Sequence, residues 1–157
     1  SPCRELVRRA QEAGIRAVLH VTFRWPTRHR EGLAHILKAA CLETGQSVTT
    51  LAVYSQGLEN ELATIRAAIA AVERPALVFC AADFVAVAVQ SAVAGDGPMS
   101  SNLILAGVFN TPWSLAGGFT SIACKLDDLA AHASDRTACH PGRTRPAWHG
   151  PPGRLRP

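Results

Sequence analysis

One acidic residue, Asp83, follows a run without charged residues, Ala76 to Ala82, and the apolar pattern then continues as "FVAVAVQSAVAG". The carboxylate therefore stands where an apolar strand would lead into a helix. It could cap the helix, by accepting the free backbone N–H groups of Val85 or Ala86 at the positive end of the helix dipole. It could instead line a ligand site, because ligands of doubly wound sheets bind outside the carboxyl ends of the strands. Spacing alone leaves both roles open.

Other chemistry finds little support in the residue pattern. No G-x-G-x-x-G, P-loop or G-x-S-x-G motif occurs, and neither glycine loop, "AVAGDGP" or "LAGGF", follows a strand and opens a helix. The five cysteines and six histidines lack zinc-ligand spacing, and Cys41 and Cys80 lie in apolar runs typical of buried free thiols. Asp127 and Asp128 stand at a predicted helix start, where a capping role explains their presence. We predict no catalytic site, no metal site and no cofactor.

Short β-rich runs alternate with helix-length apolar patterns from residue 5 to about residue 133. The predicted strands are 16–23, 47–54, 76–82, 102–109 and 120–125, and the main predicted helices are 30–45, 59–72 and the segment from Asp83. Gly45 suits the position just past a helix end. Strands that are apolar on both faces and separated by helices predict an α/β fold, a doubly wound and mainly parallel sheet with helices on both faces.

The chain shows no segment typical of membrane insertion or secretion. No apolar run approaches the roughly 20 residues of a membrane helix. The first residues, "SPCRELVRRAQEAG", predict an amphipathic helix rather than a signal peptide. We therefore expect a cytoplasmic protein without a membrane partner.

Residues 134–157 differ in composition from the rest. They hold five arginines against one aspartate, whereas residues 1–133 balance 11 Lys+Arg with 11 Asp+Glu, so the net charge of +4 belongs to the tail. We predict a folded lobe over 1–133 and a disordered Arg/Pro-rich tail over 134–157. The tail is either a nucleic-acid-binding arm or the product of a shifted reading frame in a GC-rich gene.

A series of motifs resembles the effector-binding domain of the lactose/galactose-repressor (LacI/GalR) family of transcriptional regulators. The segments "PALVFCAADFVAVA", "LILAGVFN", "GGFTSI" and "LDDLAAHA" follow the order of the family's P-x-A…N-D-x-x-A, G-[FY]-D-D, T-T-[IV] and L-x-x-L-G-x-x-A motifs. Upstream, "LVRRAQEAGIRAVLHVTFRWPTRHREGLAHILKAACLETG" resembles the family's helix–strand–helix unit. The likeness spans about residues 5–133. It implies one lobe of a periplasmic-binding-protein-like fold that senses a small effector, such as a sugar or a nucleoside-like compound.

The resemblance also implies a binding site at the strand ends. The family's effector-binding arginine, three residues before the helix glycine, corresponds to His29, which is flanked by Arg28. A histidine can donate to a sugar hydroxyl but lacks the guanidinium fork. The alternative is that these residues form only a solvated basic helix start.

Other family positions carry less polar residues here. Ala82 stands where the family has a ligand-binding asparagine, and Asp83 matches the aspartate that follows it. Phe109 and Asn110 stand where the family has two aspartates after G-[FY]. Phe109 could stack on a flat ligand, or it could simply extend the packing of the strand. The predicted ligand-binding residues are Arg28, His29, Asp83, Phe109 and Asn110. Trp25 and Trp113 could stack on a ring at the same edge, or could be partly buried surface aromatics.

Three polar contacts of the family are thus absent, so the lobe either binds a ligand less polar than a free sugar or no longer binds one. The resemblance implies DNA binding only through a helix-turn-helix domain that is absent from this chain, and homodimers as the assembly. Two alternatives remain open: a fragment of a transport-type sugar-binding protein, and a non-functional truncated or frameshifted remnant.

Overall fold

Five parallel strands form the centre of the fold in the computed structural model, which describes residues 1–25 and 28–123. The strands are β1 (Ala17–Phe23), β2 (Ser47–Val53), β3 (Ala76–Cys80), β4 (Leu103–Val108) and β5 (Thr120–Ile122). Each lies within a segment predicted from the sequence, and every neighbouring pair runs parallel. The predicted boundary at residue 133 and the tail lie outside the described residues.

The strand order β2-β1-β3-β4-β5 confirms the doubly wound sheet. The chain moves outward from β1 to β2, then returns past β1 to build β3, β4 and β5 on the other side. The direction of winding therefore reverses between β1 and β3, and a fold of this kind binds ligands outside the carboxyl ends of its strands near that reversal.

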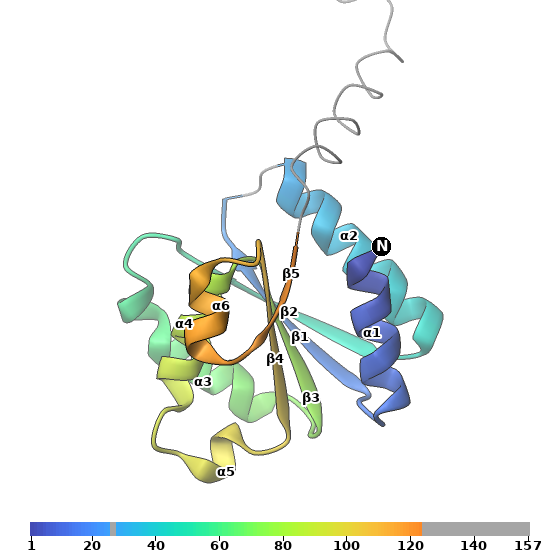
Figure 1. The fold of residues 1–157 in the computed structure, drawn as a ribbon. Helices are drawn as coiled ribbons and strands as arrows, with labels where there is room; N and C mark the ends of the chain where they lie inside the picture. Colours follow the sequence, from blue (N-terminus) through green and yellow to red (C-terminus); the bar gives the residue numbers. More distant parts are fainter. Residues whose placement is uncertain (26–27, 124–157) are drawn as a thin grey trace, which may run out of the picture. The chain divides into compact units, whose positions relative to one another are not determined.

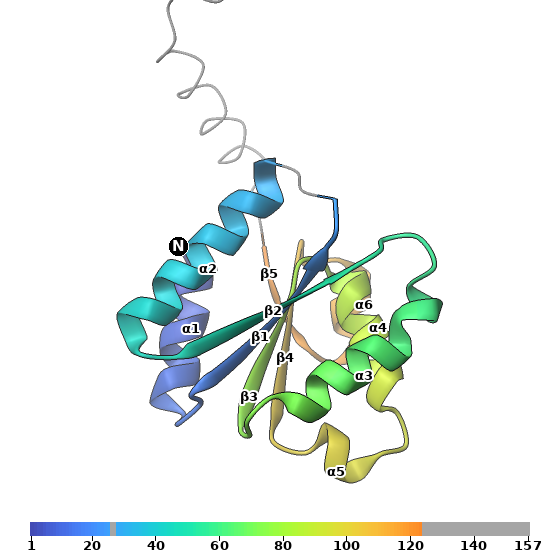
Figure 2. The same cartoon turned by 180° about the vertical axis from the view of Figure 1, so that it is seen from behind.

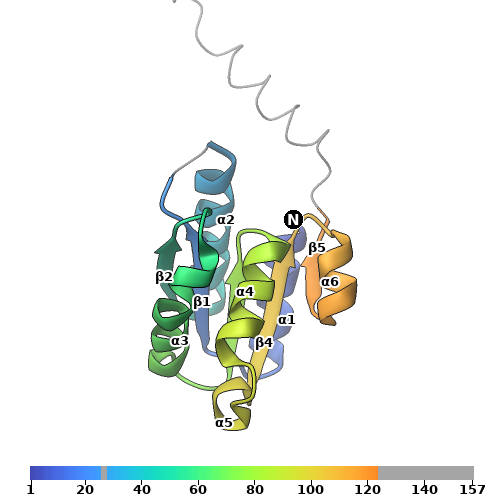
Figure 3. The ribbon, with the colours of Figure 1, turned by 90° about the vertical axis from the view of Figure 1, so that its left-hand side faces the viewer.

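Helices cover both faces of the sheet, as predicted (Figure 1 and, from behind, Figure 2). Helices α1 (Pro2–Glu12) and α2 (Arg28–Thr44) lie on one face; α3 (Leu62–Ala71), α4 (Asp83–Val93) and α6 (Pro112–Gly117) lie on the other. Figure 3 looks onto this second face, with α1 behind the sheet. Two short turns of helix, η1 (Leu58–Glu61) and α5 (Gly97–Ser100), precede α3 and β4.

Side chains alternate between two apolar cores along the central strands. From β3, Leu77 and Phe79 pack with the α1–α2 layer, while Val78 and Cys80 pack with the α3–α4 layer. All five residues of β3 are buried, which explains why its sequence is uniformly apolar. Each fully buried side chain of this size stabilises the fold by about 1.5–3 kcal/mol.

Local signals placed the longer helices well and the short ones poorly. Gly45 follows the last residue of α2 with φ +70°, the left-handed conformation that glycine adopts without penalty. The six residues of α6 were predicted as part of a loop. They begin with Pro112 and end before Gly118, too short a segment for an apolar period to be visible.

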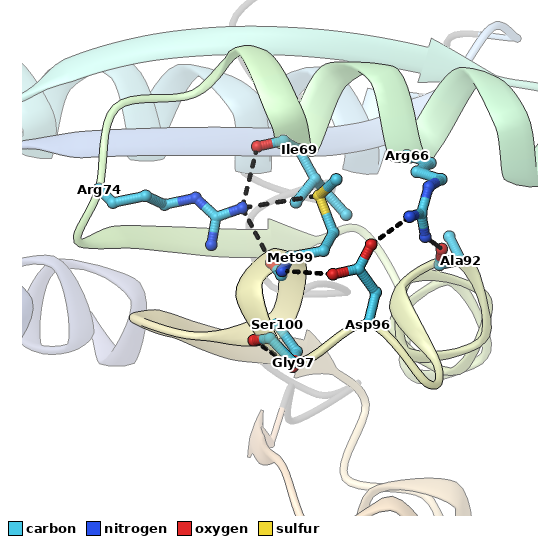
Figure 4. Close-up of polar contacts among 8 residues, drawn as sticks. All are labelled: Arg66, Ile69, Arg74, Ala92, Asp96, Gly97, Met99 and Ser100. Carbon is cyan, nitrogen blue, oxygen red and sulfur yellow. Dashed lines mark hydrogen bonds and ion pairs between the residues drawn. The ribbon is translucent and has the colours of Figure 1, made fainter.

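Two arginines make hydrogen bonds and an ion pair near the amino ends of the strands (Figure 4). In the figure, the Arg74 guanidinium donates to the carbonyl oxygens of Met99 (2.9 Å) and Ile69 (3.2 Å). It also donates to the carbonyl oxygen of Ser101 (2.6 Å). Nearby, Arg66 pairs with Asp96, which also accepts a bond from the Met99 backbone N–H. The polar groups at this end thus satisfy one another within the fold.

Candidate functional site

Asp83 is the first residue of α4, at the carboxyl edge of the sheet, and only 1% of its surface is exposed. The N-cap of α4 is Ala82, and no side chain caps this helix. The backbone N–H groups of Val85 and Ala86 donate instead to the carbonyl oxygen of Ala82. The predicted capping role of Asp83 is therefore wrong, because its carboxylate is directed to other donors.

The Asp83 carboxylate joins three segments of the chain. Its Oδ2 accepts hydrogen bonds from the backbone N–H (2.7 Å) and the hydroxyl (2.8 Å) of Thr111, which precedes α6. Its Oδ1 accepts a bond from the hydroxyl of Ser121 in β5 (2.6 Å). Hydrogen bonds to an ionised acceptor are the strong ones. The carboxylate therefore ties the start of α4 to the end of β4 and to β5.

Two residues between β4 and α6 adopt left-handed backbone conformations. Phe109 has φ +95° and Asn110 has φ +50°, in a region that non-glycine residues seldom occupy. Their backbone N–H groups donate to the Ile122 carbonyl oxygen (2.9 Å) and the Ser121 hydroxyl (2.9 Å), respectively. With Thr111, three successive amides of this loop are anchored to β5 or to Asp83.

Sequence reasoning missed Thr111 and Ser121. They lie 28 and 38 residues from Asp83, and nothing in their local pattern marks them as partners of a carboxylate. The signal that could have found Ser121 is the pairing of β4 with β5, which places it opposite Gly107. A Cβ atom on Gly107 would lie 2.2 Å from the Asp83 Oδ1, so glycine is required where β4 passes the carboxylate.

The five predicted site residues all follow strands at the same edge. Arg28 and His29 form the start of α2 after β1, Asp83 follows β3, and Phe109 and Asn110 follow β4. The edge thus brings together the ends of three neighbouring strands. Asp83 lies behind this edge with its carboxylate occupied, whereas Asn110 is exposed and Phe109 is 42% exposed. Ligand contact by these residues stays a prediction.

Exposed aromatic side chains gather at this carboxyl edge. Five of the eight large exposed apolar residues are aromatic, and each lies within a few positions of a strand end: Trp25 (68% exposed), Tyr54 (46%), Phe84 (43%), Phe109 (42%) and Trp113 (57%). Sequence reasoning had pointed to the two tryptophans and to Phe109, but not to Tyr54 or Phe84. Their positions directly after a strand and at a helix start would have marked them.

Two of these rings are held by neighbours. The Arg24 guanidinium lies over the Tyr54 ring, 4.8 Å from its centroid. Phe84 stacks on the buried Phe23, with centroids 5.4 Å apart and planes at 25°. The edge between β2 and α6 therefore offers flat aromatic faces and, at Arg24, a cation. Such a surface can stack on a ring, but it supplies few acceptors for ligand hydroxyls.

Nucleophilic and metal chemistry find no support among residues 1–25 and 28–123. No group of three His, Cys, Asp or Glu side chains in this part could hold a metal ion. Cys41 and Cys80 are buried thiols. Burial raises the pKa of Cys41 to about 11; burial, and secondarily the Asp83 charge, raises the pKa of Cys80 further. Both thiols are protonated at neutral pH and are poor nucleophiles.

His20 is an isolated polar group in the core. It lies in β1 beside Phe79, is 1% exposed, and neither ring nitrogen has a hydrogen-bond partner in the described part of the chain. Burial, with a smaller effect of the Lys38 charge, lowers its pKa to about 4. The imidazole is therefore neutral at physiological pH and lies away from the carboxyl edge.

Comparison with known proteins supports the fold. No family model matches the chain, and no curated protein matches it. Its structure is similar to the crystal structure of a probable maltose operon transcriptional repressor from Staphylococcus aureus, with a TM-score of 0.63 and 10% sequence identity. The match covers 85% of this chain and 49% of that one, so this chain spans about half the length of its structural neighbour.

At 10% identity the likeness shows the α/β fold, and membership of the LacI/GalR family stays a prediction. None of the helices in residues 1–25 and 28–123 combines the length and apolar character needed to cross a bilayer.

Proposed function

We propose that this chain is the ligand-sensing part of a bacterial transcription regulator. It binds a small effector at the carboxyl edge of the sheet and controls DNA binding through a helix-turn-helix domain outside this chain. The observation that carries the proposal is the set of exposed aromatic rings at the strand ends of a doubly wound sheet. The fold likeness to a maltose operon repressor supports the same reading.

The chemistry of the edge favours a ligand with a flat, weakly polar face. Phe109 and Trp113 offer rings for stacking, and Asn110 offers an exposed amide. Asp83 is occupied by Thr111 and Ser121, so it positions the loop while the others meet the ligand. Arg28 and His29, the first residues of α2, follow β1 at the same edge, and their contact with the ligand is part of the proposal. A sugar presented by its apolar face and a nucleoside both suit this surface.

Isothermal titration calorimetry with maltose and with adenosine tests the proposal. We expect one probe to bind the full chain, and Trp113→Ala to weaken that binding by about tenfold, the loss of one ring contact. Leu42→Ala is the control: Leu42 is also exposed, at 84% against 57% for Trp113, but lies near the end of α2 that points away from the edge. If neither probe binds, the sugar and nucleoside assignment is wrong. If Leu42→Ala weakens binding as much as Trp113→Ala, the site is not at this edge.

We propose in addition that the chain forms homodimers. Leu115 on α6 is 84% exposed and Trp113 is 57% exposed, so the outer surface of this short helix is apolar. An apolar surface of this kind favours association with a second copy.

A further inference from the structure

The loop between β4 and α6 holds Phe109 in a conformation that this residue disfavours, next to a left-handed Asn110. Phe109, at φ +95°, lies beyond the usual left-handed region, and Asn110, at φ +50°, lies within it. Glycine would adopt either conformation freely, but neither position is glycine. Strained backbone of this kind persists only when surrounding contacts impose it.

Most of the contacts that hold it converge on one buried carboxylate, while the Phe109 N–H donates to the Ile122 carbonyl oxygen of β5. Thr111, directly after the strained pair, donates its backbone N–H and its hydroxyl to the Asp83 Oδ2. Asn110 donates its N–H to the Ser121 hydroxyl, which in turn donates to the Asp83 Oδ1. Because Asp83 is 1% exposed, water cannot readily replace it as the acceptor.

The surrounding structure is built to accommodate the carboxylate. Gly107 leaves the space that it fills, since a Cβ there would lie 2.2 Å from Oδ1 and 3.1 Å from the Asp83 Cα. The ring of Phe119 would also lie 3.1 Å from this Cβ. The carboxylate therefore occupies a defined position between α4, β4 and β5.

We propose that Asp83 is a positioning residue: through Thr111 and Ser121 it holds the strained Phe109–Asn110 backbone, which presents the Phe109 ring at the carboxyl edge and couples that edge to β5. The inference rests on the proposed function for its ligand consequence, since the presented ring belongs to the proposed site. Its structural part, the strain held by Asp83, does not depend on any ligand.

A thermal double-mutant cycle on the full chain tests the structural part without a ligand. At Phe109, glycine relieves a backbone conformation that alanine would keep, and both variants lack the ring, so Phe109→Gly should melt about 3–5 °C above Phe109→Ala. In the Asp83→Asn background the loop has already relaxed, and the two variants should melt at the same temperature. The effect of glycine on the unfolded chain is common to both backgrounds and cancels in the cycle.

Ser121→Ala provides a second background in case Asp83→Asn does not fold. It leaves the carboxylate in place but removes both the donor to Asp83 and the acceptor for the Asn110 N–H. The difference in melting temperature between Phe109→Gly and Phe109→Ala should again disappear. An equal difference in the wild-type, Asp83→Asn and Ser121→Ala backgrounds overturns the proposal, because the strain would then be independent of the network.

Binding of maltose or adenosine separates positioning from direct contact. If Asp83 positions the loop, Ser121→Ala weakens binding of the active probe about as much as Asp83→Asn. If Asp83 contacts the ligand itself, Ser121→Ala binds like the wild type, which overturns the positioning role. If no probe binds the wild type, the proposed function fails for these ligands, while the thermal cycle still decides the role of Asp83.

Discussion

His20 should make the fold sensitive to mild acid. The imidazole is buried in β1 without a hydrogen-bond partner in the described part of the chain, and burial, aided by Lys38, lowers its pKa to about 4. In the unfolded chain the pKa of a histidine is about 6.5. Because the folded value is the lower one, the unfolded state takes up the proton first as the pH falls. Stability is therefore full above pH 6.5 and is lost as the pH falls towards 4.

The size of the effect follows from the two pKa values. A difference of about 2.5 pH units corresponds to about 3 kcal/mol of unfolding free energy, with about 2 kcal/mol already lost at pH 5. Replacing His20 by leucine keeps a similar volume and removes the titrating group. The variant should also be more stable at pH 7, because the neutral imidazole is buried with both nitrogens unpaired.

Urea unfolding followed by far-ultraviolet circular dichroism at pH 7 and pH 5 measures this directly. The wild type should lose about 2 kcal/mol between the two values, and His20→Leu should lose much less. His35→Gln is the control, since His35 is exposed on α2, and it should keep the wild-type loss. Equal losses in the wild type and in His20→Leu would show that His20 is not the group responsible.

Three further outcomes are expected. Gly107→Ala should lower the free energy of unfolding in urea by about 2 kcal/mol, because the new Cβ meets the Asp83 carboxylate. Gly32→Ala, where a Cβ meets nothing within 4 Å, should be neutral or stabilising, and equal effects of the two substitutions would contradict the close approach at Gly107. Arg74→Met should lower the free energy of unfolding by about 1–3 kcal/mol, because three carbonyl oxygens lose their donor. Arg4→Met breaks the exposed pair with Glu43 and should lower it by under about 1 kcal/mol, and the reverse order would contradict the stabilising role of Arg74. Analytical ultracentrifugation should show a dimer or larger species, and a clean monomer at high concentration would contradict self-association.

The sheet was predictable because its signals are local. A uniformly apolar strand such as β3 can only be buried on both faces, and the spacing of Ile65 and Ile69 already marks the buried side of α3. Strand ends then define the carboxyl edge, which placed Asp83 there, and the resemblance to the LacI/GalR family added Arg28 and Phe109 to the same edge.

The contacts within the site were less predictable because they depend on strand register. Whether Ser121 lies beside Asp83 depends on the pairing of β5 with β4, and a shift of one residue would direct the hydroxyl to the opposite face. The exposed Tyr54 and Phe84 were likewise read as ordinary apolar positions. Their exposure follows from their place beyond the strand end, where no helix of the described part covers them.

Asp83 shows how a local interpretation can be right about position and wrong about role. The sequence pattern favours a capping role for a carboxylate at a helix start, because it indicates only partners that are close in the sequence. Here the backbone of Ala82 accepts the nearby amides, which leaves the carboxylate for Thr111 and Ser121. The buried Asp83 carboxylate is thus occupied within the fold, while Ala82 and Phe109 stand where the resemblance to the LacI/GalR family predicts ligand-binding polar residues. Recognition at this edge is accordingly expected to rest on ring faces more than on acceptors for hydroxyl groups, and the ranking of adenosine against maltose in the binding assay is the direct measure of that expectation.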